Sequence, residues 1–281
     1  MKKFIQHSYM ILLVLTCVII VPMTLFLQSC KEDTPIDEPD NPVITTTTTS
    51  AADSITTTTT TTTTTSAPTT TTTTRAPDTT TTFPSATDTV SFPDTLFIGD
   101  SRTVGLRDYG KTTDATFFCA VSLSSNNVLT KAVEVNGYGE IKLSDLLAKK
   151  QFKIAYIMLG INEIGGSLSS IAGKYQNIIN LIHEKQPDTI VVVQSTLHVT
   201  ETRNSQELKK GGHFNNDRIN DLNAQLAELA NGTTVRYLDM NPMYDDENGC
   251  LMAEAAAGDG IHIKAKYYLL WREYLDEHRI A

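Results

Sequence analysis

The chain of 281 residues carries 23 Lys and Arg against 32 Asp and Glu, a formal net charge of -9. No basic stripe interrupts this acidic balance, which argues against a nucleic-acid partner because phosphate binding needs clustered Lys and Arg. Composition is uneven, since residues 1–30 are mostly apolar, residues 31–94 contain few hydrophobic groups, and residues 95–281 resemble a globular domain. That last stretch is long enough to bury a core of ordinary size.

The N-terminus predicts an export signal. Lys2 and Lys3 precede an apolar run over residues 9–27, the order of a positive region and a hydrophobic region in such signals. Leu27-Gln28-Ser29-Cys30 resembles a bacterial lipobox, in which lipidated Cys30 would become the new N-terminus. The alternative is an uncleaved signal anchor with both lysines held inside. Both interpretations predict an extracytoplasmic protein tethered to the membrane.

Residues 31–94 predict a linker. An acidic, Pro-rich stretch over residues 31–43 leads into Thr-rich tracts that run to about residue 82. Such tracts have almost nothing apolar to bury, so they cannot offset the entropy lost on ordering. We expect an extended spacer, of a composition that often carries O-linked sugars, which holds the domain away from the membrane.

The remaining sequence alternates strand and helix patterns. Short apolar runs predict five strands, at residues 95–98, 115–121, 153–159, 190–193 and 235–238. Apolar residues spaced three and four apart predict helices at residues 143–150, 169–185, 217–230 and about 264–278. This alternation predicts an α/β fold, a three-layer α/β/α sandwich around a five-stranded parallel sheet. In such folds ligands lie beyond the carboxyl ends of the strands, at a switch in strand order.

Gly99-Asp100-Ser101-Arg102 directly follows the first predicted strand. A serine between a strand and a helix is held rigidly, which suits a nucleophile. The alternative is a structural turn in which Asp100 or Ser101 caps the helix. Arg102 either binds an acidic group of a substrate or braces the loop, and the sequence leaves both roles open.

Two further loops carry candidate residues. Asn162 follows the third strand, where its amide could face a developing oxyanion, although taken by itself the residue fits an ordinary β–α loop with an Asx-turn better. Asp259 and His262 share a glycine-rich loop before the last helix. A carboxylate at that spacing can fix the tautomer of the imidazole and stabilise its protonated form. Both could instead be solvent-facing loop residues.

Taken in order, Gly99-Asp100-Ser101, Gly160-x-Asn162 and Asp259-x-x-His262 resemble three sequence blocks of the SGNH (GDSL) hydrolase superfamily. The resemblance covers roughly residues 95–281. It implies a flavodoxin-like fold with strand order 2-1-3-4-5. It also implies that Ser101 is a nucleophile, that His262 is its base and that Asp259 orients the imidazole.

One block departs from the family pattern. The family usually has a glycine after the second strand, whose N–H completes the oxyanion hole, and Ser122 stands there in this chain. A backbone N–H does not depend on the side chain, so Ser122 can donate if it adopts the required dihedral angles. The resemblance therefore implies an oxyanion hole of Ser101, Ser122 and Asn162, with no metal ion or organic cofactor.

Other reactive side chains give weaker signals. Cys119 and Cys250 either form a disulfide or stay buried as free thiols, and with no CxxC they make a poor metal site. His183, His198 and His213 lack the ligand spacing of a zinc site. His198 and Glu163 either line the substrate cleft or have solvated or core roles.

The resemblance implies a serine ester hydrolase, and the expected export on a stalk favours substrates at the cell surface. We therefore expect removal of acetyl groups from polysaccharide or peptidoglycan. Two other classes remain open, an O-acetyltransferase of cell-surface glycans and a non-catalytic carbohydrate-binding module. The expected partner is a small ester or an acylated glycan, and the sequence does not indicate an oligomeric state.

Overall fold

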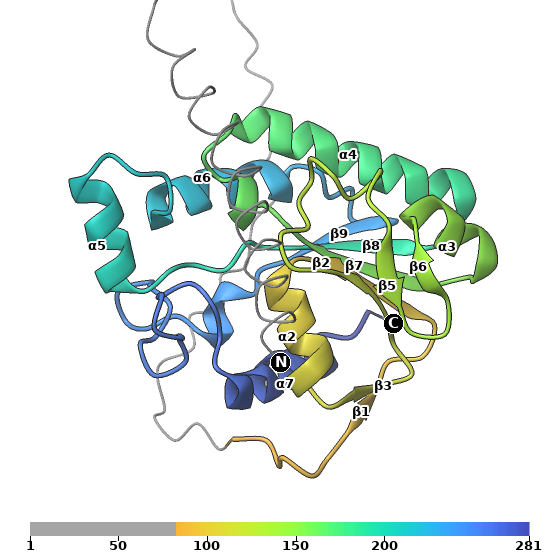
Figure 1. Cartoon of the computed structure of the whole chain (residues 1–281), viewed down its shortest axis with the longest axis horizontal. Coiled ribbons are helices and arrows are strands. Elements are labelled where there is room, and N and C mark those ends of the chain that lie inside the picture. The colour runs from red at the N-terminus through yellow and green to blue at the C-terminus, as the bar shows by residue number, and fades with distance from the viewer. Residues whose placement is uncertain (1–82, 281) are drawn as a thin grey trace, which may run out of the picture. The chain divides into compact units, whose positions relative to one another are not determined.

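The structure, a computed structural model, describes residues 83–280 (Figure 1). The expected export signal, Cys30 and nearly all of the Thr-rich linker lie outside the described residues. Among residues 83–280, no helix combines the length and the apolar character needed to span a membrane.

A parallel sheet of five strands forms the centre of the fold, in the order β4-β2-β7-β8-β9. This is the expected order 2-1-3-4-5, and the predicted fold class is confirmed. The strands are β2 Thr95–Gly99, β4 Thr116–Cys119, β7 Ile154–Met158, β8 Ile190–Gln194 and β9 Val235–Leu238. Each end lies within one residue of its predicted position, except that β4 ends two residues early.

Side chains alternate between the two faces of the sheet. Leu96 and Ile98 of β2 join one hydrophobic cluster, whereas Phe97 between them joins the other. Strands buried on both faces become apolar at nearly every position, as in β8, where Val191, Val192 and Val193 are fully buried. The sheet therefore forms the middle of three layers.

Helices cover both faces (Figure 1). One face carries α3 Leu143–Lys149, α4 Leu168–Lys185 and α6 Asn216–Ala227, and the other carries α2 Ser101–Tyr109 and α7 Tyr268–Glu277. The predicted helix at 264–278 begins instead as a short 3-10 turn, η3 Ala265–Tyr267. A further helix, α5 Glu201–Lys209, was not predicted because its sequence has almost no apolar periodicity. Its start is fixed by the Thr200 hydroxyl, which accepts the N–H of Arg203.

Smaller elements complete the described residues. They are the parallel pair β1 Val90–Ser91 and β3 Thr112–Thr113, the hairpin β5 Val133–Val135 and β6 Gly139–Ile141, and the 3-10 turns η1 Ile161–Glu163 and η2 Asn241–Met243.

The folded unit begins upstream of residue 95, which was the expected start of the domain. β1 pairs with β3, and the Phe92 side chain is only 2% exposed. The Arg272 guanidinium donates a hydrogen bond to the Asp88 carbonyl at 2.6 Å. Residues 88–92 thus form part of the folded unit rather than of the spacer.

Candidate active site

Ser101 lies at the junction of β2 and α2. Asp100 caps the helix, because its carboxylate accepts the N–H of Arg102 at 2.9 Å. The Ser101 side chain is therefore not needed as a cap and is free for another role. Gly99 permits the tight turn, since a Cβ atom there would lie 1.9 Å from the Thr103 hydroxyl oxygen. The sequence left open whether Asp100 or Ser101 caps this helix, and the structure shows that the cap is Asp100.

The loop before α7 brings an imidazole to Ser101. Ser101 Oγ lies 2.9 Å from His262 Nε2, and His262 Nδ1 lies 2.5 Å from Asp259 Oδ2. The other carboxylate oxygen, Asp259 Oδ1, accepts the backbone N–H groups of Ile261 and His262 at 2.9 and 3.0 Å. A hydroxyl, an imidazole and a carboxylate thus form one continuous hydrogen-bonded chain across 161 residues of sequence.

Electrostatics fixes the direction of these hydrogen bonds. Partial burial raises the pKa of Asp259, but the hydrogen bonds from His262 and Ile261 outweigh it and hold the pKa at about 2. An ionised carboxylate only accepts hydrogen bonds, so the proton of the neutral imidazole lies on Nδ1. Nε2 is then the acceptor for the Ser101 hydroxyl, which is the tautomer that a general base requires.

Arg102 ties the loop of His262 to the helix of Ser101. Its side chain is 1% exposed, and it donates to the Leu197 carbonyl at 3.0 Å and to the Ile261 carbonyl at 3.1 Å. Ile261 directly precedes His262, so the guanidinium helps to fix the position of the imidazole relative to Ser101. Of the two roles left open for Arg102, the structure shows the brace, and a group this buried is not presented to a substrate.

Ser122 has the backbone conformation that explains a glycine at this place in the family. Its φ angle is 62°, in the left-handed region that residues with a Cβ atom rarely adopt. The turn is closed by a hydrogen bond from the Leu123 N–H to the Ala120 carbonyl at 3.1 Å. Among the described residues, the Ser122 N–H donates to no acceptor and remains available.

Asn162 lies in η1, after β7. Its Nδ2 donates one hydrogen to the Leu123 carbonyl at 2.9 Å, which leaves the second hydrogen of the amide. Ser101 is the first residue of α2, so its own N–H has no partner within the helix. The Ser101 N–H, the Ser122 N–H and the Asn162 amide follow β2, β4 and β7, which are neighbours in the sheet. All three therefore lie beyond the carboxyl ends of adjacent parallel strands. Such N–H groups can stabilise a developing negative oxygen.

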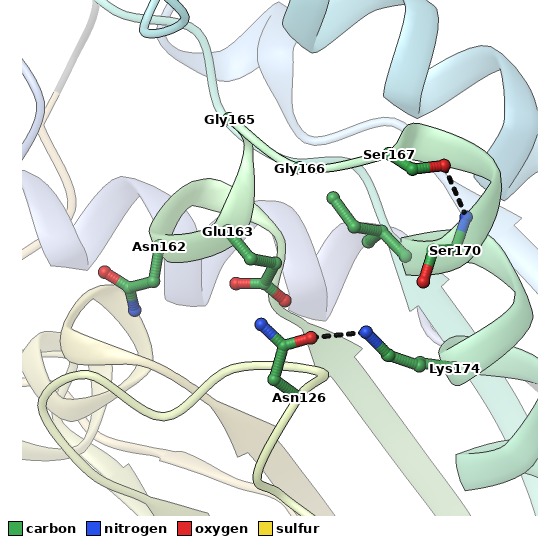
Figure 2. Close-up of a pocket in the computed structure, with 9 residues that line it drawn as sticks. Asn126, Asn162, Glu163, Gly165, Gly166, Ser167, Ser170 and Lys174 are labelled. Atoms are coloured by element: carbon green, nitrogen blue, oxygen red, sulfur yellow. Dashed lines mark hydrogen bonds between the residues drawn. The ribbon is translucent and has the colours of Figure 1, made fainter. Parts of the chain in front are cut away.

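The residue after Asn162 is buried. Glu163 is 8% exposed, and its Oε1 accepts the N–H of Ser125 at 2.6 Å. Ser125 lies in the same loop as Ser122, three residues further along the chain. Glu163 also lines a polar cavity of about 270 Å³ together with Asn126 and Lys174 (Figure 2). Asn126 and Lys174 belong to no recognisable motif, so no sequence pattern indicates them.

Among residues 83–280, none of the remaining candidates hydrogen-bonds to the Ser101 side chain. His198 pairs through Nδ1 with Asp245 at 2.9 Å and through Nε2 with Asn220 at 2.8 Å, so both ring nitrogens are occupied. Cys119 and Cys250 are both buried and free, which decides between the two roles left open for them. Within residues 83–280, no group of three or more His, Cys, Asp and Glu side chains could hold a metal ion.

Comparison with known proteins identifies the family. The sequence model of the GDSL-like lipase/acylhydrolase family matches residues 97–270, more than half of the chain. The chain belongs to the GDSL-like lipase/acylhydrolase family. Membership places it among esterase-type and acyltransferase-type enzymes. No curated protein matches this GDSL-like chain.

Solved structures share its fold. A protein from Streptococcus pneumoniae, proposed to be a platelet activating factor, superimposes with a TM-score of 0.51 at 20% identity, covering 66% of this chain and 83% of that one. A GDSL-like lipase from Bacteroides thetaiotaomicron gives a TM-score of 0.48 at 16% identity, with 65% and 85% covered. A family 3 carbohydrate esterase from Talaromyces cellulolyticus gives 0.46 at 13% identity, with 67% and 95% covered. The first of these superpositions, at 20% identity, shows a shared fold and no particular activity.

Proposed function

We propose that this GDSL-like protein is an extracytoplasmic serine ester hydrolase that removes O-acetyl groups from cell-surface polysaccharide or peptidoglycan. The observation that carries the proposal is the 2.9 Å contact between Ser101 Oγ and His262 Nε2, with Asp259 2.5 Å from the far nitrogen of the same ring. A serine hydroxyl is a weak nucleophile until an adjacent base takes its proton. This geometry supplies that base and its orienting carboxylate.

The reaction follows from these roles. Ser101 Oγ attacks the ester carbonyl while His262 Nε2 takes the hydroxyl proton, and Asp259 stabilises the resulting imidazolium. The N–H groups of Ser101 and Ser122, with the Asn162 amide, hold the negative oxygen of the tetrahedral intermediate. The C–O bond to the alcohol then breaks, and the alcohol leaves with the proton from His262. Water, deprotonated by His262, releases acetate and regenerates Ser101.

Accessibility supports a large substrate. The side chains of His262 and Asp259 are each 44% exposed, and Ser122 is also exposed. An ester attached to a bulky polymer can approach such a site, whereas an acyl chain of a lipid gains most from a deep apolar tunnel. An acetyl group needs no such tunnel, so this exposure favours a short acyl group on a large alcohol.

Hydrolysis of a short-chain aryl acetate, compared between the parent protein and Ser101→Ala, tests the proposal. We expect kcat to fall by about 10⁴-fold or more, because members of a triad act as a unit. Ser122→Gly, which suits the left-handed conformation, serves as a variant that should keep activity. Equal rates for the parent protein and Ser101→Ala would contradict the proposed enzyme. The alternative function, a non-catalytic carbohydrate-binding module, would then be favoured. Preferential transfer of acetyl to an added sugar rather than to water would favour the O-acetyltransferase.

We also propose, from the sequence alone, that Cys30 is lipidated and tethers the domain to the outside of the cytoplasmic membrane. In cells fed a labelled fatty acid, the parent protein should take up label and Cys30→Ala should not. Membrane retention without any label in the parent would instead favour the uncleaved signal anchor.

A further inference from the structure

A polar cavity lies beside the proposed oxyanion hole. It has a volume of about 270 Å³ and is bounded by η1, the start of α4 and the loop after β4 (Figure 2). Asn162 belongs to its wall, so the cavity and the proposed site share one side chain. Its other polar side chains are Asn126, Glu163, Ser167, Ser170 and Lys174.

Glu163 has an unused acceptor at this cavity. The residue is only 8% exposed, and Oε1 is occupied by the Ser125 N–H. Oε2 is buried as well and has no hydrogen-bond partner within the described residues. Figure 2 shows the carboxylate between Asn162 and the side chain of Asn126. Leaving a buried acceptor unpaired is unfavourable, so the site favours a molecule that brings a donor.

The charges at the cavity oppose each other. Lys174 Nζ donates to Asn126 Oδ1 at 2.5 Å and makes no ion pair with Glu163 among the described residues. A positive group at the rim and a carboxylate at the wall together select neither an anion nor a cation. Ile171 is the one apolar side chain of the lining, which excludes an acyl chain as the natural occupant.

A neutral, polyhydroxylated ring matches this lining. Sugar hydroxyls both donate and accept, so one ring can donate to Glu163 Oε2 and accept from Lys174 and the Asn126 amide. The serine hydroxyls at the start of α4 adapt to either role. The volume is of the order that a single sugar residue requires.

We propose that this cavity is a subsite for one neutral sugar ring of the acylated substrate, adjacent to the scissile ester. The proposal rests on the proposed esterase function and names its substrate class as a glycan ester. Asn162 couples the two, because the same loop faces the oxyanion and borders the ring. Binding energy from the ring would then position the ester against Ser101.

Ser170→Trp in the full chain fills the cavity, and Ser169→Trp is its matched control. Both serines lie in the first turn of α4 and are exposed, but only Ser170 borders the cavity. The readout is the ratio of kcat/KM for O-acetylated xylo-oligosaccharides, or O-acetylated peptidoglycan fragments, to kcat/KM for a short aryl acetate. We expect Ser170→Trp to lower this ratio about 10- to 100-fold, the loss of one or two hydrogen bonds to the ring. The aryl acetate rate of Ser170→Trp, and both rates of Ser169→Trp, should stay near those of the parent.

Glu163→Gln gives a second test, because the amide keeps an oxygen for the Ser125 N–H and replaces the free acceptor with a donor. In Glu163→Gln, the ratio of kcat/KM for the acetylated glycan to kcat/KM for the aryl acetate should also fall. A ratio unchanged in Ser170→Trp, or an equal fall for both substrates, would overturn the subsite. Aryl acetate hydrolysis that survives in Ser101→Ala would overturn the proposed function instead, so the two failures are distinguishable.

Discussion

At the scale of single residues, the position of the imidazole depends on a residue that touches no reacting atom. Arg102 spans from α2 to the Leu197 and Ile261 carbonyls, and Ile261 is bonded to His262. A misplacement of about 1 Å in such an arrangement can cost about 10²-fold in rate. The guanidinium is therefore a positioning residue for the proposed base.

Arg102→Lys tests that role. Lysine keeps the charge but has one ammonium group in place of a planar fork, so it cannot hold both carbonyls in the same geometry. We expect kcat for a short aryl acetate to fall about 10- to 100-fold, with KM nearly unchanged. Arg107→Lys is the control, because Arg107 lies on the same helix but its side chain is 41% exposed and does not hydrogen-bond to the loop of His262. A rise in KM with kcat preserved would indicate contact with substrate and contradict the brace.

The buried thiols give a prediction in pH. Burial raises the pKa of Cys119 from 9.0 to about 12, and burial also raises the pKa of Cys250. Since the thiolate is the reactive form, neither thiol should react with iodoacetamide at pH 8 in the native protein, and both should react after unfolding. Because the folded pKa of Cys119 exceeds the unfolded one, its contribution to stability is complete below pH 9 and is lost as pH rises toward 12. Rapid native labelling of peptides containing either cysteine would contradict this.

At the scale of elements, the segment after β8 supports the loop of His262. Residues 195–200 are buried without regular secondary structure. Asn223 Oδ1 accepts the Thr196 N–H at 2.8 Å while its Nδ2 donates to the Thr196 carbonyl at 2.9 Å. Asn216 pairs in the same way with Val199, at 2.9 and 3.0 Å. Side-chain amides thus replace the missing neighbour strand, as buried backbone groups require.

The supported segment in turn holds the candidate site. Its Leu197 carbonyl accepts from Arg102, and its Thr200 N–H donates to the Gly260 carbonyl at 3.0 Å. Gly260 has a φ of 71°, and a Cβ atom there would lie 2.5 Å from the Thr200 hydroxyl oxygen. The close approach of these two segments therefore requires glycine.

Asn223→Leu should lower the free energy of unfolding by about 1–3 kcal/mol, because it leaves the buried Thr196 N–H without an acceptor and removes one of the two donors to the Thr196 carbonyl. Chemical denaturation measures the loss. Asn177→Leu, at an exposed position of α4, is the control and should change stability by less than about 0.5 kcal/mol. Similar values for both variants would show that the amide pairing does not matter.

Sequence patterns predicted the regular elements better than the irregular ones. The five strands were evident because a sheet buried on both faces makes its strands continuously apolar. Helix α5 was not, since nine largely polar residues gain their place from a cap and from tertiary contacts. The left-handed turn at Ser122 was expected only through the family resemblance, because a serine gives no local sign of a positive φ.

At the scale of the whole molecule, the start of the folded unit reaches across the domain. Phe92 packs edge-on against Phe97 at 5.8 Å, and Arg279 donates to the Ser91 carbonyl at 2.7 Å. This N-terminal arm, residues 88–92, has apolar residues too few and too scattered to stand out in the sequence beside a Thr-rich tract. The boundary expected from composition therefore lies downstream of the first packed residues.

Phe92→Ala should lower the free energy of unfolding by about 3–5 kcal/mol, the usual cost of emptying a buried aromatic site. Phe83→Ala is the matched control, because Phe83 is 40% exposed and should cost less than about 1.5 kcal/mol. Thermal or denaturant unfolding of the two variants gives the comparison. An equal and small effect of both would mean that the arm is dispensable.

The residues of the candidate site are distant in sequence, and topology brings them together. The strand order places β4 and β7 on either side of β2, so the loops that hold Ser101, Ser122 and Asn162 lie at one edge. The sequence predicted Ser101, Asn162 and the Asp259–His262 pair from their places after strands and before a helix, and Ser122 only through the family resemblance. It left the brace as one of two open roles for Arg102 and did not predict the cavity at Glu163, because both depend on long-range packing.

Reaction with a fluorophosphonate, followed by peptide mass spectrometry, tests the central claim most directly. Such reagents modify a serine that a neighbouring base has activated. We predict one adduct, on the peptide that contains Ser101, and labelling that is slowed about 10³-fold or more in His262→Ala, although Ser101 is unchanged. An unlabelled Ser101 in the folded parent protein, or equal labelling with and without the imidazole, would contradict the account.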